Sequence, residues 1–148
     1  MKTLIQNYTS TLSTEAMYLH RCLIECQENA EIWSNPNISA FDMFDSYKPD
    51  LFITHYKFLT SDMIKYLSQS SNIDLVMNVT GINPDELKML ENIVGNGVKM
   101  PLAFSNLYSN IPKSEKIKII NLYPAADIFI APVPTPDYDI DTCIVSIE

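Results

Sequence analysis

Strand-like and helix-like patterns alternate along this chain almost without a break from Thr3 to Tyr123, and this alternation constrains the fold most. Short apolar runs are each followed by a longer segment whose apolar residues recur every three or four positions. Parallel strands need a long crossover connection, usually a helix, and such crossovers are right-handed. The pattern therefore predicts a sheet of parallel strands joined by helices.

The predicted elements follow from these periodicities. Strands are expected at residues 3–8, 30–34, 51–56, 73–79, 100–105 and 116–123. Helices are expected at residues 14–29 and 39–47, and in two further segments that begin after Thr60 and after Asn83. Asn83 with Pro84 and Glu86 forms the clearest helix start, a capping box with proline at the first helical position. The fold class is α/β: a Rossmann-like or flavodoxin-like doubly wound parallel sheet with helices on both faces.

The length and the C-terminal region set the domain organisation. A chain of 148 residues has room for one domain, which we place at residues 1–131. We expect residues 132–148 to form a Pro-rich linker and then the first strand of a possible missing second domain. A lone last strand has no sheet of its own to bury it. Either this segment folds back onto the first domain, or the chain is one half of a two-domain protein.

Composition and charge exclude several classes of protein. Hydrophobic residues make up 47% of the chain and charged residues 19%, which excludes disorder of the whole chain. A net charge of −8 argues against nucleic acid or an anionic membrane as the main partner, because both are polyanions. No run reaches the roughly 18 apolar residues of a membrane span. We expect a cytoplasmic protein, since its N-terminus lacks a secretory pattern.

The cysteines predict no metal site, because their spacing matches no ligand motif. Cys22 and Cys26 lie one turn apart on the first predicted helix. We expect them to be small core thiols in a reducing compartment. Met17, Leu19, Leu23, Ile24 and Cys26 are expected to form the buried stripe of that helix.

The residues that follow the predicted strands point to a ligand site. In an open parallel sheet, ligands bind beyond the carboxyl ends of the strands. These positions carry hydroxyls, amides and aromatic rings, with no Lys or Arg before Lys57, which suits a neutral, hydroxyl-bearing ligand such as a sugar. The same residue types also occur in turns that bind nothing. The candidate ligand-binding residues are Tyr8, Thr9, Ser10, Thr11, Tyr56, Thr80, Gly81 and Asn106.

His55 is the one histidine at the predicted ligand edge, where it ends the third strand. An imidazole there could act as a general base toward a ligand hydroxyl. The alternative is a structural histidine that is hydrogen-bonded to nearby backbone.

The turn after the first strand supports a second reading. Residues 9–14 (TSTLST) resemble the flavodoxin phosphate loop, T-x-T-G-x-T, which binds the phosphate of FMN. Leu12 stands at the position of the glycine that lets the backbone close around the phosphate. An FMN-binding protein is therefore the alternative function.

Two stretches resemble the N-terminal domain of GT-B glycosyltransferases, particularly the spore-maturation-type group. Residues 44–55 (FDSYKPDLFITH) resemble the helix that ends in K-P-D and leads into a strand facing the interdomain cleft. Residues 121–127 and 138–145 resemble the passage from the first domain to the second. The resemblance implies an acceptor-side domain with His55 as the base. It also implies that a nucleotide-sugar donor binds mainly to the missing domain, so we expect no cofactor and no catalysis by this chain alone.

A third reading is a non-catalytic interaction domain. Residues 139–147 could pair with the sheet edge of a second copy, as in other cases of edge-strand addition. This reading predicts a homodimer.

Overall fold

The computed structural model describes residues 1–7, 14–105 and 113–121. Within them the strands are β1 (Lys2–Gln6), β2 (Asn29–Trp33), β3 (Leu51–His55), β4 (Asp74–Asn78), β5 (Leu102–Ser105) and β6 (Ile119–Asn121). The helices are α1 (Thr14–Glu25), α2 (Ala40–Tyr47), α3 (Ser61–Gln69) and α4 (Pro84–Gly95), with a 3₁₀ turn, η1, at Tyr56–Phe58. No described helix is both long enough and apolar enough to cross a bilayer.

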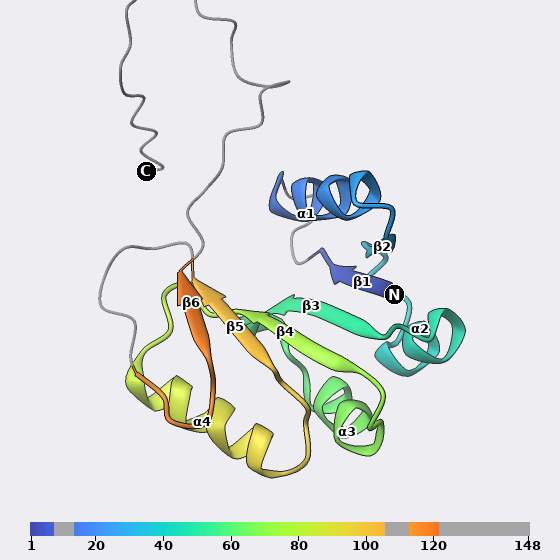
Figure 1. The fold of residues 1–148 in the computed structure, drawn as a ribbon. Helices are drawn as coiled ribbons and strands as arrows, with labels where there is room; N and C mark the ends of the chain where they lie inside the picture. Colours follow the sequence, from blue (N-terminus) through green and yellow to red (C-terminus); the bar gives the residue numbers. More distant parts are fainter. Residues whose placement is uncertain (8–13, 106–112, 122–148) are drawn as a thin grey trace, which may run out of the picture.

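The strands form one sheet in the order β2-β1-β3-β4-β5-β6, and every neighbouring pair is parallel. The first five strands have the order of flavodoxin-like sheets, and β6 extends the sheet at one edge. Connections leave β1 and β2 toward opposite faces, so α1 lies on one face and α2, α3 and α4 lie on the other (Figure 1). This arrangement confirms the predicted α/β, doubly wound fold.

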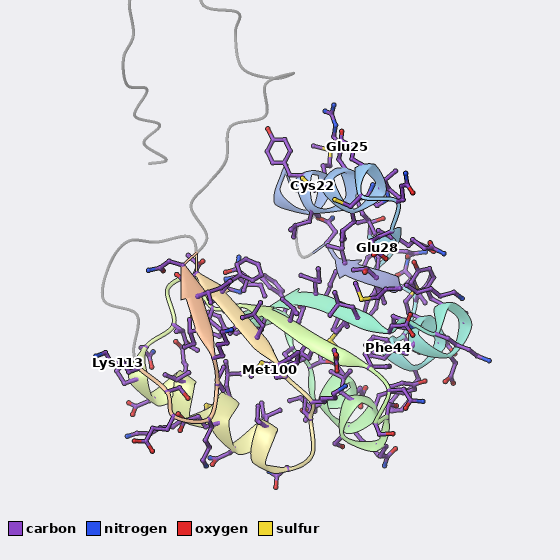
Figure 2. The ribbon with its side chains drawn as sticks, viewed as in Figure 1. Cys22, Glu25, Glu28, Phe44, Met100 and Lys113 are labelled. Carbon is purple, nitrogen blue, oxygen red and sulfur yellow. The ribbon has the colours of Figure 1, made fainter. Side chains whose placement is uncertain are left out.

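The larger core lies between the sheet and helices α2, α3 and α4. Phe44 of α2 and Phe52 of β3 are both fully buried, and their ring centroids lie 5.0 Å apart in a T-shaped pair. Figure 2 labels Phe44 at the α2 end of the molecule. Trp33 of β2 packs edge-on against Phe44, with 6.3 Å between the ring centroids. This aromatic group joins three consecutive elements of the chain, β2, α2 and β3.

The second, smaller core lies under α1. Ala16, Leu19 and Leu23 of this helix pack on Ile5 and Ile53 of the sheet. The predicted stripe was therefore wrong in part. Met17 is 38% exposed and Ile24 is 49% exposed, because they lie more than about 100° around the helix from the buried face.

The cysteines of α1 were also predicted incorrectly. Cys22 and Cys26 are free thiols and both are exposed, so they are not core residues. The helix ends at Glu25 rather than near Asn29, since Gln27 adopts a left-handed conformation with φ of 61°. This left-handed residue ends the helix before Cys26 can join a buried face.

The start of α4 matches the sequence prediction closely. The Asn83 side chain accepts hydrogen bonds from the backbone N–H groups of Asp85 and Glu86. In return, the Glu86 carboxylate accepts a hydrogen bond from the Asn83 backbone N–H at 2.9 Å. The reciprocal bonds form a complete capping box, with Pro84 at the first helical position.

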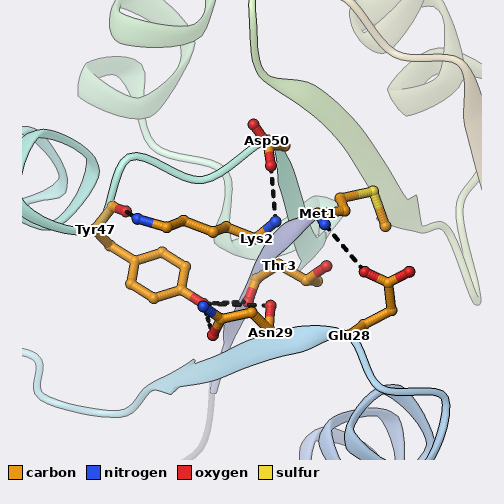
Figure 3. A network of polar contacts seen from close by, with 7 residues as sticks. All are labelled: Met1, Lys2, Thr3, Glu28, Asn29, Tyr47 and Asp50. Atoms are coloured by element: carbon orange, nitrogen blue, oxygen red, sulfur yellow. Dashed lines mark hydrogen bonds and ion pairs between the residues drawn. The ribbon is translucent and has the colours of Figure 1, made fainter.

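A network of hydrogen bonds and ion pairs connects the elements at the amino-terminal edge of the sheet (Figure 3). The backbone N–H of Lys2 donates a hydrogen bond to the Asp50 carboxylate at 2.8 Å. The side-chain ammonium group of Lys2 donates a second one to the Tyr47 carbonyl at 3.4 Å. The Tyr47 hydroxyl donates to the carbonyl of Thr3 at 3.3 Å and lies equally close to the Asn29 side chain. Burial, and then the neighbouring carboxylates, raise the pKa of Tyr47. These groups bind one another and hold β1, β2 and α2 in place.

Replacing Phe44 tests the larger core. Phe44→Ala is expected to lower the free energy of unfolding by about 3–5 kcal/mol, because it leaves a cavity among aromatic rings. Met89→Ala is the matched control on α4, where the side chain is 66% exposed, and should change stability by less than about 0.5 kcal/mol. Urea unfolding followed by circular dichroism measures both. Similar losses in the two variants would contradict this core.

Candidate functional site

The carboxyl ends of the strands meet at one edge of the sheet because all strand pairs are parallel. Gln6, His55, Asn78, Ser105 and Asn121 end β1, β3, β4, β5 and β6. The order of the strands reverses between β1 and β3, which makes this the topological switch point. We call this part of the molecule the carboxyl edge.

The structure brings together those predicted site residues that it describes. His55 ends β3 and Tyr56 follows it, and Thr80 and Gly81 come after the neighbouring strand β4, so all four lie at the carboxyl edge. The other predicted ligand-binding residues lie outside the described residues. These are Tyr8, Thr9, Ser10, Thr11 and Asn106.

His55 caps the short helical turn that follows β3. Its Nδ1 accepts a hydrogen bond from the Lys57 backbone N–H at 3.2 Å. A neutral imidazole in this position carries its proton on Nε2. The contact fits the structural alternative for His55. Its role as a base stays a prediction, and that role requires the bond to Lys57 to open.

An aromatic cluster lies beside the switch point, formed by His55, Tyr56 and Phe58. The rings of His55 and Tyr56 stack with centroids 4.8 Å apart, and Phe58 meets His55 edge-on at 5.9 Å. Phe58 is 40% exposed although it is a large apolar side chain. Sequence reasoning missed Phe58. The available signal was an aromatic residue between the end of β3 and the Thr60 cap, in a stretch with no strand or helix to bury it.

Tyr56 connects the end of β3 to the start of α4. Its hydroxyl donates to Glu86 Oε2 at 3.2 Å and lies 3.3 Å from the Gly81 carbonyl oxygen. Burial raises the pKa of Tyr56, and the hydrogen bond and charge of Glu86 raise it further. Gly81 has φ of 80°, a conformation that other residues adopt only with strain. Glycine there lets the turn bring its carbonyl to the tyrosine.

Buried polar groups stabilise the edge from inside the sheet. Thr54 of β3 donates a hydrogen bond to the Gln6 side chain of β1, directly across the switch point. Asn78 of β4, which is 4% exposed, accepts from the Thr80 backbone N–H at 2.9 Å. Sequence reasoning missed Gln6, Thr54 and Asn78, because it considered residues that follow strands rather than residues within them.

A small hollow opens among these groups, with a volume of about 10 Å³. This is room for about one water molecule. This hollow is too small to hold a sugar or a flavin. The hollow is lined by Ile5, Gln6, Ala16, Leu19, Ile53, Thr54, Asn78 and Phe104.

The described residues hold no cluster of three or more His, Cys, Asp or Glu side chains that could bind a metal ion. Comparison of the chain with protein-family models, with curated proteins and with solved structures found no match.

Removing the Tyr56 hydroxyl tests its link to Glu86. Tyr56→Phe is expected to lower stability by about 1 kcal/mol at pH 8. The folded pKa of Tyr56 lies above its ordinary value of 10.0, so this contribution is complete below pH 10 and is lost as the pH rises through the folded pKa. Urea unfolding of both proteins at pH 8 and at about pH 11 should show a smaller difference at the higher pH. A difference that stays constant or grows would contradict this role.

Proposed function

We propose that this chain binds a neutral, hydroxyl-bearing ligand such as a sugar at the carboxyl edge. We further propose that it is the acceptor-side domain of a GT-B-like glycosyltransferase. The aromatic cluster next to the switch point, in which half-buried His55 and Tyr56 lie beside the 40% exposed Phe58, is the observation that carries the proposal.

Aromatic rings at this position suit a sugar for a physical reason. The face of an aromatic ring carries a partial negative charge, so the C–H groups on one face of a pyranose pack favourably against it. The hydroxyls around the ring can then bond to neighbouring polar groups. The Thr80 side chain and the backbone groups of Thr80 and Gly81 lie after the adjacent strand, within the same edge.

The charges at the edge favour a neutral ligand over a phosphate. Among the described residues that follow the strands at this edge, Lys57 is the one cation, and its ammonium group lies 5.6 Å from the centre of the Tyr56 ring. The Glu86 carboxylate accepts a hydrogen bond from the hydroxyl of the same tyrosine. A phosphate placed there would be repelled by Glu86.

Transfer chemistry on this edge would need one change at His55. Its Nδ1 lone pair accepts the Lys57 N–H, so the neutral ring offers Nε2–H as a donor to an acceptor hydroxyl. Acting as the base requires the other tautomer, with Nδ1 released from Lys57. A closed cleft with a donor-binding domain supplies the second substrate, because transfer needs both held together.

FMN binding is the second candidate, and the strand order favours it. The order of the first five strands is that of flavodoxin-like sheets, which bind FMN at the β1/β3 switch point. The shared order is an analogy of fold, so it carries less weight than the chemistry of the edge.

Affinity measurements with probe sugars test the proposal. Calorimetric titrations with glucose, N-acetylglucosamine and maltose are expected to show saturable binding of at least one of them. Phe58→Ala should weaken it about tenfold, equivalent to about 1.4 kcal/mol of stacking. His55→Asn should weaken it while preserving the turn, because an Asn side chain can accept the N–H two residues later. Met89→Ala, on α4, is the control.

Two results would overturn the sugar proposal. Equal affinity in the wild type and in Phe58→Ala would remove the aromatic cluster from the site. Tight binding of FMN with quenched flavin fluorescence, and no sugar binding, would favour the flavodoxin-like alternative.

A further inference from the structure

Two exposed thiols lie one turn apart at the end of α1. Cys22 and Cys26 are both free and both exposed, although cysteine is among the residue types that are most often buried. Figure 2 labels Cys22 on α1, the helix at the top of the view. The reactivity of the sulfur usually matters more than packing for a free cysteine. Sulfur chemistry, rather than packing, is therefore what these two side chains can contribute.

The end of α1 fixes the spacing of the two thiols. The Cys26 backbone N–H donates a hydrogen bond to the Cys22 carbonyl at 3.0 Å, which is the regular bond of an α-helix. The Glu28 backbone N–H donates to the Leu23 carbonyl at 2.9 Å, across the left-handed residue Gln27. This combination is a Schellman motif, which closes the last turn. Cys26 is thus held one turn after Cys22, on the same face of the helix.

This spacing suits a bridging ion better than a disulfide. Side chains four positions apart on a helix have Cβ atoms about 5–6 Å apart. A disulfide needs Cβ atoms about 3.5–4.5 Å apart, so the bond could form only if the last turn opened. Two sulfurs that each bind one ion at about 2.3 Å can lie up to about 4.6 Å apart. Rotation about χ1 of both cysteines reaches that separation while the backbone stays in place.

The charge around the pair favours a cation. The carbonyl end of a helix carries a partial negative charge, and both thiols lie in or next to the last turn of α1. That turn contains no basic residue. Arg21 lies just before it, and its guanidinium forms an ion pair with Glu25 at 3.0 Å. A positive ion bound to the two sulfurs therefore meets the negative end of the helix.

We propose that Cys22 and Cys26 form a two-thiolate site for a soft monovalent cation, Cu(I). Thiolate ligands select Cu(I), Zn²⁺ and iron–sulfur clusters. Structural Zn²⁺ and the clusters take four ligands, and no third His, Cys, Asp or Glu among the described residues forms a metal-binding group with the pair. A linear Cu(I) centre needs only two sulfurs. On binding, each thiol releases its proton to solvent, so two Cu–S bonds replace two S–H bonds and no electron is transferred.

This site is separate from the proposed ligand site. Helix α1 begins after the carboxyl end of β1 and ends before the amino end of β2, so its last turn lies toward the amino-terminal edge. The carboxyl edge lies at the opposite end of the same strands. The two proposals can therefore fail independently.

Competition for Cu(I) under nitrogen tests the proposal in the full chain. Reduced protein is titrated into the coloured Cu(I) complex of bicinchoninate, whose absorbance falls as the protein takes the ion. The starting protein carries Cys143→Ser, because Cys143 is a third thiol and lies outside the described residues. Uptake of one equivalent is expected. Cys26→Ser in this background should weaken uptake about 100-fold, because the second sulfur no longer binds at the high effective concentration of a tethered ligand.

The matched control keeps two thiols and changes only their placement. In Ile24→Cys combined with Cys26→Ser, the second thiol lies two positions after Cys22, about 160° around the helix. Ile24 is 49% exposed, so the exchange leaves the core intact. This control should weaken Cu(I) uptake as much as Cys26→Ser alone. Circular dichroism verifies that both variants keep the helix content of the starting protein.

Four outcomes would overturn the proposal. The first is the absence of Cu(I) uptake, and the second is equal uptake by the starting protein and the control, which would mean that any two thiols suffice. Uptake by the natural sequence that disappears in Cys143→Ser would assign the ion to Cys143. A disulfide between Cys22 and Cys26 that persists in a reducing glutathione buffer would leave no thiolate for an ion.

Discussion

Parallel strand pairing is the constraint from which the rest of this structure follows. A tight turn cannot join parallel strands, so each connection must cross a face of the sheet and return to the same end. Every strand therefore finishes at one edge, and the residues that follow β3 and β4 become neighbours although they are far apart in the chain. The amino-terminal edge receives the remaining loop ends, and Lys2 donates hydrogen bonds to both Tyr47 and Asp50 there. The two edges thus differ in what they offer a ligand.

The same winding makes the two faces unequal. After β2 the chain adds strands in one direction only, so α2, α3 and α4 gather on one face over Phe44 and Phe52. Helix α1 remains on the other face with a small core around Ile5 and Ile53. Asymmetric winding is therefore the reason that the core on one face is larger than the core on the other.

The sequence predicted most of the fold because its local signals agree. The apolar periodicity separated strands from helices, and the Asn83 capping box fixed the start of α4. Three things were not predictable. The buried face of α1 depends on the sheet beneath it, so Met17 and the cysteines were misplaced. The Thr54–Gln6 bond needs the β1–β3 pairing, which no local pattern encodes. Phe58 joins the site only because η1 turns it beside His55.

The polar groups of the carboxyl edge are largely engaged with the protein itself. His55 accepts a backbone N–H, Asn78 caps a turn and Tyr56 bonds to Glu86. Under the proposed function, a neutral sugar would stack on the aromatic cluster, in which Phe58 is 40% exposed. Two-dimensional amide spectra, recorded during a titration with N-acetylglucosamine, test this most directly. We predict shifts confined to residues 55–58 and 78–83. Shifts confined to the amino-terminal edge or to the outer surfaces of α3 and α4 would contradict a carboxyl-edge site.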